Sequence, residues 1–135
     1  MRYMLDTNIC IYLLKACPPQ VVQRFENIQV GQVVMSVVTY AELRHGIERT
    51  PAVDRMAAFH ALRQVVDRVQ VLHFDEQAAE KFGVLANAVR QRSRDTMDRL
   101  IAAHAASVGL TLVTNNEADF KDYPGLVVEN WALPD

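Results

Sequence analysis

The sequence predicts one α/β domain over residues 1–135, with a parallel central sheet and helices on both of its faces. Short apolar runs alternate along the whole chain with longer segments of helical periodicity, as in strand–helix repeats that build parallel sheets. A chain of 135 residues can bury one core without disulfides or metals. Half of the residues are hydrophobic and 22% are charged, which is ordinary for a globular protein.

The strand and helix segments follow in order along the chain. Five short apolar runs predict strands: Tyr3–Leu5, Gln32–Met35, Val69–Leu72, Leu110–Thr114 and Leu126–Val128. Six segments between them predict helices: Thr7–Lys15, Pro19–Ile28, Val38–Glu48, Pro51–Arg68, Asp75–Arg92 and Arg99–Val108. Proline at the start of the second helix and Gly109 after the last one agree with the residue preferences of helix ends. The sequence leaves the order of the strands in the sheet open.

Charge, hydropathy and cysteine content exclude several classes of protein. The formal net charge of −2 gives no general attraction for polyanions, so a nucleic-acid contact would need a local basic patch. No apolar run reaches the ~20 residues that span a bilayer, and the N-terminus MRYMLDTN lacks the apolar region of a signal peptide. We therefore expect a cytoplasmic protein without a membrane contact. Cys10 and Cys17 fit no disulfide framework and are predicted to be reduced, and the histidines fit no zinc motif.

Four acidic residues lie where the ends of strands and the beginnings of helices are predicted. Asp6 directly follows the first strand, Asp98 stands at the head of the last helix, and Asp119 comes shortly after the fourth strand. Glu42 lies inside the helix that follows the second strand. Because open parallel sheets carry their functional groups at the carboxyl ends of the strands, we expect these side chains to converge.

Each acid also has a purely structural interpretation. Asp6 and Asp98 could cap helices, since a carboxylate accepts hydrogen bonds from the free N–H groups of a first turn. Asp119 could be a turn residue, and Glu42 a solvated charge on a helix. Glu42, however, interrupts an apolar stretch, so its carboxylate should have a cation or a hydrogen-bond donor as partner.

Taken together, the acids favour a metal site. The helix after Asp98 is small or apolar on nearly every side, which predicts that it is buried and that Asp98 faces the interior edge of the fold. Four converging carboxylates would repel one another unless a cation joined them, and Mg²⁺ and Mn²⁺ prefer such oxygen ligands. With no Gly-rich phosphate loop in the sequence, hydrolysis of a phosphodiester fits better than the use of a nucleoside triphosphate.

Three sequence blocks at these acids resemble a known family. MLDTNICIYLLK, SVVTYAELRHGIE and MDRLIAAHAASVGLTLVTNNEADF, in that order, are similar to the PIN-domain ribonuclease toxins of bacterial type II toxin–antitoxin systems, the VapC-like group. The resemblance implies an endoribonuclease that depends on Mg²⁺ or Mn²⁺ and cleaves single-stranded or loop RNA. It places Asp6, Glu42, Asp98 and Asp119 at the positions of the catalytic, metal-binding acids.

The resemblance also implies supporting groups and partners. Polar side chains that would orient the acids or bound water are Thr7, Asn8, Thr114 and Asn115. Family members commonly form homodimers and are neutralised by a small antitoxin protein, whose C-terminal peptide fills a groove of the toxin. The sequence departs from the family at Asp95, where many relatives have glycine; a metal contact, repulsion of RNA and simple exposure to solvent are all compatible with that residue.

A basic run near Asp98 is the best candidate for a contact with RNA phosphates, namely Arg90, Arg92, Arg94 and Arg99. The alternative is a solvated helix end. Two other functions compete with the nuclease. The presence of all four acids argues against a PIN-fold binding module that has lost its catalytic activity, and an assay would decide. A receiver-like signalling domain matches poorly, because the expected Asp and Lys do not follow the corresponding strands.

Overall fold

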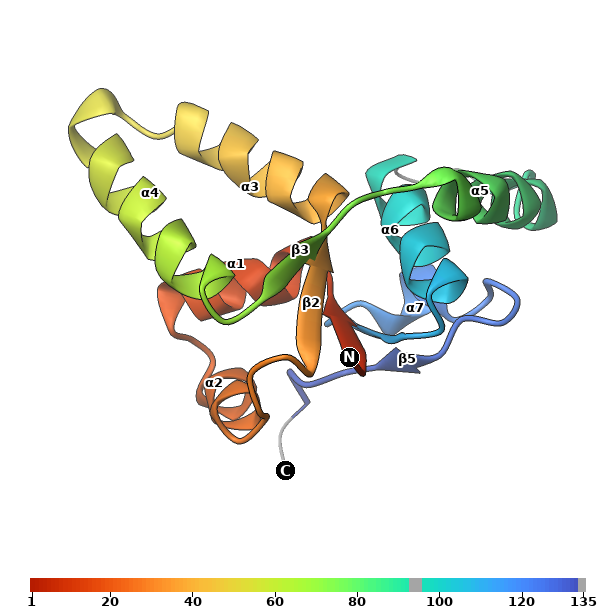
Figure 1. The fold of residues 1–135 in the computed structure, drawn as a ribbon, viewed down its shortest axis with the longest axis horizontal. Helices are drawn as coiled ribbons and strands as arrows, with labels where there is room; N and C mark the ends of the chain where they lie inside the picture. Colours follow the sequence, from red (N-terminus) through yellow and green to blue (C-terminus); the bar gives the residue numbers. More distant parts are fainter. Residues whose placement is uncertain (93–95, 134–135) are drawn as a thin grey trace.

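In the computed structural model, which describes residues 1–92 and 96–133, a parallel sheet forms the centre of the chain (Figure 1). Its strands lie in the order β3-β2-β1-β4-β5. Their bounds are Tyr3–Leu5 for β1, Val33–Ser36 for β2, Gln70–Leu72 for β3, Thr111–Val113 for β4 and Val128–Glu129 for β5. Every neighbouring pair is parallel, and Leu5 of β1 is in register with Val113 of β4. The predicted α/β class and parallel sheet are confirmed.

The helices also follow the prediction, with shifts at their ends. They are α1 (Thr7–Lys15), α2 (Pro19–Glu26), α3 (Val37–Glu48), α4 (Ala52–Val66), α5 (Glu76–Ala88), α6 (Thr96–Ser107) and α7 (Glu117–Phe120). Two differences affect the candidate site. Helix α6 begins at Thr96, earlier than predicted, so Asp98 lies in its first turn and not ahead of it. Helix α7 was not predicted, because a single turn is too short to show helical periodicity, and it contains Asp119.

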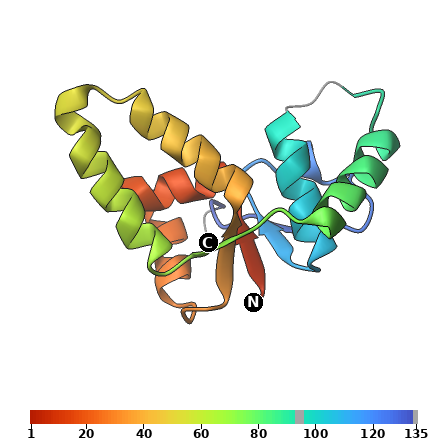
Figure 2. The ribbon, with the colours of Figure 1, turned by 45° about the horizontal axis from the view of Figure 1, so that its top comes forward.

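Side chains alternate between the two faces of the sheet, and each face has its own hydrophobic core. On β1, Tyr3 and Leu5 belong to the core formed with α1, α2, α3 and α4, whereas Met4 belongs to the core formed with α5 and α6. Figures 1 and 2 show the α3–α4 hairpin and the α5–α6 pair on opposite sides of the sheet. Because strands buried on both faces are apolar throughout, they appear in the sequence as continuous apolar runs.

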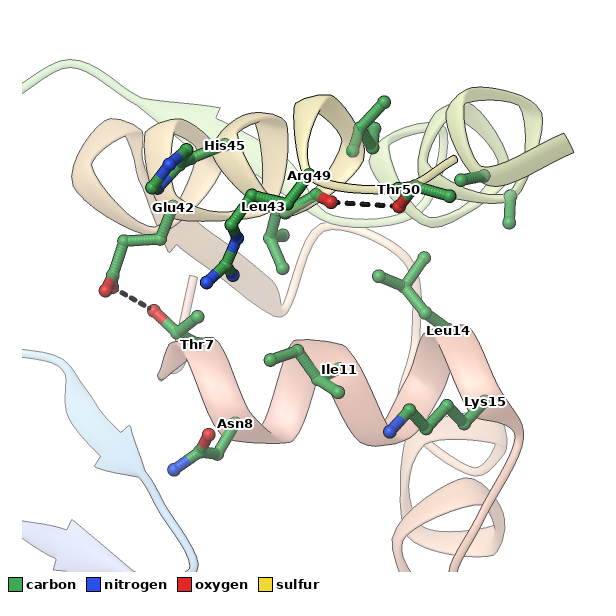
Figure 3. Close-up of a pocket in the computed structure, with 14 residues that line it drawn as sticks. Thr7, Asn8, Ile11, Leu14, Lys15, Glu42, Leu43, His45, Arg49 and Thr50 are labelled. Carbon is green, nitrogen blue, oxygen red and sulfur yellow. Dashed lines mark hydrogen bonds between the residues drawn. The ribbon is translucent and has the colours of Figure 1, made fainter. Parts of the chain in front are cut away.

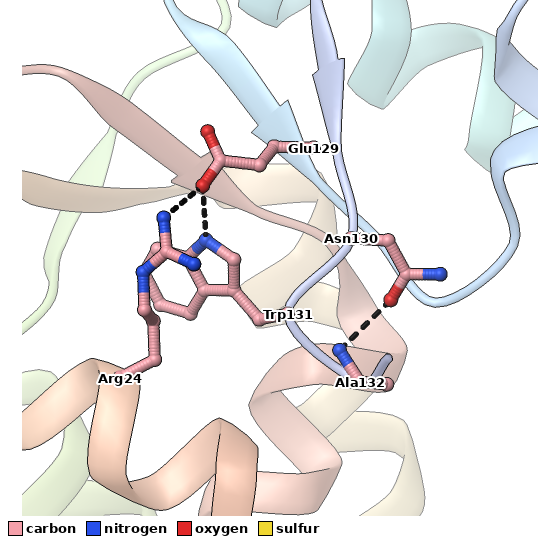
Figure 4. A network of polar contacts seen from close by, with 5 residues as sticks. All are labelled: Arg24, Glu129, Asn130, Trp131 and Ala132. Carbon is pink, nitrogen blue, oxygen red and sulfur yellow. Dashed lines mark hydrogen bonds and ion pairs between the residues drawn. The ribbon is translucent and has the colours of Figure 1, made fainter. Parts of the chain in front are cut away.

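The segment after β5 fastens this edge strand to α2 (Figure 4). Trp131 is buried, packs edge-on against Tyr3 at 5.2 Å between ring centroids, and donates from Nε1 to Glu129 Oε1 at 2.9 Å. The same carboxylate forms an ion pair with Arg24 of α2. Gln20 Nε2 donates to the carbonyl of Ala132 at 2.8 Å. The C-terminal segment therefore protects an edge strand of only two residues.

Two further expectations concern the cysteines and membrane contact. Both cysteines are free, as predicted: Cys10 is buried in the core and Cys17 is exposed. Burial, with a smaller contribution from the charge of Asp6, raises the pKa of the Cys10 thiol far above its usual range, so the thiol is neutral and unreactive. No described helix has the length and apolar character needed to cross a membrane.

Candidate active site at the carboxyl end of the sheet

Asp6 is fixed at the junction between the central strand and the first helix. It is the only residue between β1 and α1, and its backbone N–H donates to Val113 O at 2.9 Å. Its Oδ1 accepts a hydrogen bond from Ile9 N at 2.9 Å, so Asp6 is the N-cap of α1. The side chain is nevertheless almost fully buried, at 5% exposure. Asp6 thus has the capping role of a structural residue, but its carboxylate is buried and not exposed to solvent.

The charge of Asp6 is poorly compensated. Burial raises its pKa from 3.8 to about 6, against the lowering effect of hydrogen bonds from the Thr114 side chain and the backbone N–H groups of Ile9 and Asn8. The negative charge of Glu42 raises the pKa further. A carboxylate that is buried, hydrogen-bonded and still hard to ionise is stabilised by any cation that reaches it.

Glu42 faces the same region from α3 and has the partner that its apolar surroundings require. The Thr7 hydroxyl lies 2.5 Å from Glu42 Oε1 (Figure 3). It is also 3.4 Å from the hydroxyl of Thr39. Thr7 is the first residue of α1, directly after Asp6. The first turn of α1 therefore connects the two acids: Asp6 caps it, and Thr7 donates to Glu42. The predicted supporting role of Thr7 agrees with this contact.

Asp98 lies on α6, which packs on the opposite face of the sheet from α1. Asp98 lies in the first turn of α6 and is half-buried. The run Ile101–Ala105 behind it is fully buried, as the small and apolar residues of this helix predicted. Two sequence predictions, the RNA contact of Arg94 and the possible roles of Asp95, fall on residues outside the described ranges.

The loop after β4 contains the remaining predicted residues. Thr114 is fully buried, contacts the Asp6 carboxylate through its side chain and accepts a hydrogen bond from Asn116 N at 3.0 Å. Asn115 donates from Nδ2 to the Tyr12 hydroxyl at 2.7 Å. Asp119, half-buried on α7, accepts a hydrogen bond from the Asn116 side chain. This contact within its turn is compatible with the structural interpretation of Asp119, and its role as a metal ligand stays a prediction.

The donor set fits a hard divalent cation. Among residues 1–92 and 96–133, no three His, Cys, Asp or Glu side chains are placed so that they alone could hold a metal ion. Mg²⁺ does not need such a cage, because proteins usually bind it through one or two carboxylates while water and substrate phosphate complete the octahedron. The buried, undercompensated carboxylate of Asp6, with Glu42 close enough to raise its pKa, meets that requirement.

The basic residues beside α6 differ in the hydrogen bonds and ion pairs that they form within the protein. Arg99 reaches back to the end of α5 and donates to Arg92 O at 2.6 Å, and Arg92 forms an ion pair with Asp122. Arg90 is exposed, and its guanidinium donates to Asn87 O at 3.0 Å. Of the three arginines that the structure describes here, Arg90 is exposed and contacts a backbone carbonyl, while Arg99 connects the start of α6 to the residues that follow α5.

A cleft of about 760 Å³ opens from Glu42 along α1, α3 and α4 (Figure 3). Its apolar lining includes Ile11, Leu14 and Leu43, and its cationic residues include Lys15 and Arg49. The sequence did not predict this cleft, because it forms only when α4 folds back beside α1, and the helical pattern of α4 does not specify that contact.

Comparisons with known proteins decide the family. Residues 3–126 match the PIN domain family. The chain belongs to the PIN domain family. The tRNA(fMet)-specific endonuclease VapC of Shigella flexneri is 37% identical over 134 residues, which cover 98% of this chain and 99% of that protein. Ribonuclease VapC2 of Haemophilus influenzae is 35% identical over a match that covers 97% of this chain and 98% of that protein.

Solved structures agree with the PIN domain assignment. The DNA-bound VapBC complex of Salmonella typhimurium contains a chain that superposes with a TM-score of 0.89 at 34% identity, covering 98% of this chain and 99% of its own. A chain of VapBC2 from Rickettsia felis, bound to a promoter DNA fragment, superposes with a TM-score of 0.86 at 30% identity. The match covers 97% of this chain and 99% of that one. The predicted resemblance to the VapC-like group is confirmed, and the receiver-like alternative is excluded.

Proposed function

We propose that this PIN domain is a metal-dependent endoribonuclease that acts as the toxin of a toxin–antitoxin pair. The observation that carries the proposal is the buried Asp6 carboxylate, which is joined to Glu42 through the first turn of α1 and has a pKa raised to about 6. Relatives named as ribonucleases match nearly the full length of the chain, which supports the same activity here.

The acids would hold Mg²⁺ or Mn²⁺ at the carboxyl end of β1. Asp6, Glu42, Asp98 and Asp119 are the proposed ligands and catalytic residues. When bound, such an ion polarises a phosphodiester and lowers the pKa of a coordinated water. The chain itself orients the ligands: the Thr114 hydroxyl and the backbone of α1 fix Asp6, and Thr7 fixes Glu42. Asn8, which lines the cleft beside Thr7, would orient water or substrate.

RNA is the proposed substrate, cleaved in a single-stranded or loop region in the cytoplasm. Because two relatives are named as endonucleases specific for tRNA(fMet), transfer RNA is the first substrate to test. Arg90, Arg92, Arg94 and Arg99 would contact phosphates, which position a strand without selecting its sequence. Among the described members of this run, Arg90 is the first to test, because it is exposed and its guanidinium donates to a backbone carbonyl of its own turn, that of Asn87.

The cleft between α1, α3 and α4 is the proposed seat of the antitoxin. Its apolar lining together with Lys15 and Arg49 suits an amphipathic peptide with acidic residues, and the similar solved structures include VapBC toxin–antitoxin complexes. A peptide bound there would lie beside Glu42. Exposed apolar side chains on α4, Val53 and Met56, favour a second copy of the chain as another partner.

The test is cleavage of labelled tRNA by purified protein. We expect cleavage with Mg²⁺ or Mn²⁺, none with EDTA, and recovery when metal is restored. A PIN-fold binding module without catalytic activity would bind RNA but leave it intact under every condition. Expression alone should arrest growth, and the small protein encoded next to this chain should relieve the arrest; harmless expression would refute the toxin assignment while leaving the nuclease in place.

A further inference from the structure

A buried histidine of α6 contacts the N-cap of α3, and both helices carry candidate metal ligands. His104 is on α6, as is Asp98, and only 1% of it is exposed. Its Nδ1 is 2.7 Å from the hydroxyl of Ser36. Ser36 is the last residue of β2 and the N-cap of α3, and its Oγ accepts a hydrogen bond from Val38 N at 3.1 Å. The contact therefore joins α6 to the start of the helix that carries Glu42.

The surroundings of His104 combine burial with polar contacts. The ring also has a hydrogen bond with the backbone of His73 and packs edge-on against Phe74, at 5.3 Å between centroids. Burial lowers the His104 pKa, while the charge of Asp75 and the His73 contact oppose that effect. In a neutral ring that carries its proton on Nε2, Nδ1 is free to accept the Ser36 O–H at the observed 2.7 Å.

This arrangement leaves Ser36 little freedom. Its oxygen accepts a hydrogen bond from Val38 N. With the His104 proton on Nε2, the Ser36 O–H donates to Nδ1, so the hydroxyl is both an acceptor and a donor. A buried polar group that loses its partner must shift or remain unsatisfied, and both outcomes are costly. A shift of Ser36 would move the first turn of α3 relative to α6.

We propose that Ser36 and His104 are positioning residues, which hold Glu42 on α3 and Asp98 on α6 at the separation that the metal centre requires. This inference rests on the proposed metal site. Neither side chain would touch the ion or the RNA. Their effect would be on metal affinity and turnover, because a displacement of about 1 Å in a catalytic group can cost a factor of about 100 in rate.

The test compares Mn²⁺ binding, measured by calorimetry without RNA, in wild type and matched variants. Ser36→Ala removes the hydroxyl, His104→Leu removes the acceptor at similar volume, and His104→Asn retains an acceptor near the position of Nδ1. We expect Ser36→Ala and His104→Leu each to weaken Mn²⁺ binding about fivefold or more. The double variant should be little worse than either single one, because both break the same contact. His104→Asn should bind within about twofold of wild type.

The control is Leu85→Ala, which loosens the packing of α5 against α6 and leaves the Ser36–His104 contact in place. It should lower the melting temperature without a comparable loss of Mn²⁺ affinity. The inference is overturned if Ser36→Ala binds Mn²⁺ as wild type does, or if Leu85→Ala weakens binding equally. If His104→Leu does not fold, the Mn²⁺ affinities of Ser36→Ala and His104→Asn test the inference. A wild-type protein that binds no Mn²⁺ would instead refute the proposed metal centre itself.

Discussion

Replacing Asp6 with asparagine should stabilise the metal-free protein, although it removes a residue that caps a helix. The pKa of Asp6 rises from 3.8 to about 6 on folding. Each pKa unit corresponds to about 1.4 kcal/mol, so keeping the carboxylate ionised at pH 7.5 costs the fold about 3 kcal/mol. Asparagine keeps an oxygen for the N–H of Ile9 and carries no charge. Allowing about 1 kcal/mol for weakened hydrogen bonds, we expect a net gain of about 2 kcal/mol.

The pH dependence of this gain has a definite sign. An acid whose pKa is raised on folding makes the folded state less stable as the pH rises through that pKa, so the cost grows between about pH 4 and pH 7. At pH 4.5 it should be only about 1 kcal/mol, and the advantage of Asp6→Asn should nearly vanish. Saturating Mg²⁺ should reduce or reverse the difference at pH 7.5, since wild type gains binding free energy that the variant lacks.

Differential scanning calorimetry in EDTA measures the effect directly. For a domain of this size, 2 kcal/mol corresponds to about 8 °C in melting temperature. Asp75→Asn is the matched control, because Asp75 caps α5 in the same way, accepting from Ala78 N at 3.0 Å, but is exposed. It should change the melting temperature little at either pH. If Asp6→Asn melts at or below wild type at pH 7.5 in EDTA, the charge of Asp6 is compensated and the argument from burial is wrong.

Three further predictions concern catalysis and RNA binding. Asp98→Asn should reduce cleavage about 100-fold or more while the circular dichroism spectrum stays unchanged; near-normal cleavage would remove Asp98 from the site. Thr7→Val, which deletes the donor to Glu42, should lower the rate about tenfold in the same assay, and an unaltered rate would show that Glu42 needs no such support. Arg90→Ala should weaken RNA binding and reduce the slope of log affinity against log salt concentration by about 0.7–0.9. Arg99→Ala should mainly lower the melting temperature. Equal salt slopes for wild type and Arg90→Ala would argue against a phosphate contact of Arg90.

The sequence predicted the fold well because its elements are set by local pattern. The central strands β1 and β2 are buried throughout and apolar except for Ser36, and the buried run of α6 consists mainly of small and apolar residues. The apolar surroundings of Glu42 also predicted that it must have a partner, which the structure identifies as Thr7. These features depend on residues close together in the chain, or on the cost of burying a charge.

Features that depend on distant contacts could not be predicted in this way. The order of the strands, the cleft beside α4 and the Ser36–His104 contact each join segments far apart in the sequence. A serine at the end of a strand and a histidine within an apolar helix each have ordinary structural explanations when considered alone. Only the distance of 2.7 Å between the Ser36 hydroxyl oxygen and His104 Nδ1 suggests a joint role.

The central claim is that the acids at the carboxyl end of β1 hold a divalent metal, and titration of Mn²⁺ into the RNA-free protein tests it most directly. We expect wild type to bind Mn²⁺ at pH 7.5, with heat that disappears in Asp6→Asn and Asp98→Asn. The exposed acid Asp54 supplies the control, and Asp54→Asn should bind as wild type does. Equal Mn²⁺ binding by wild type, Asp6→Asn and Asp98→Asn would contradict the account, because the ion would then be held elsewhere.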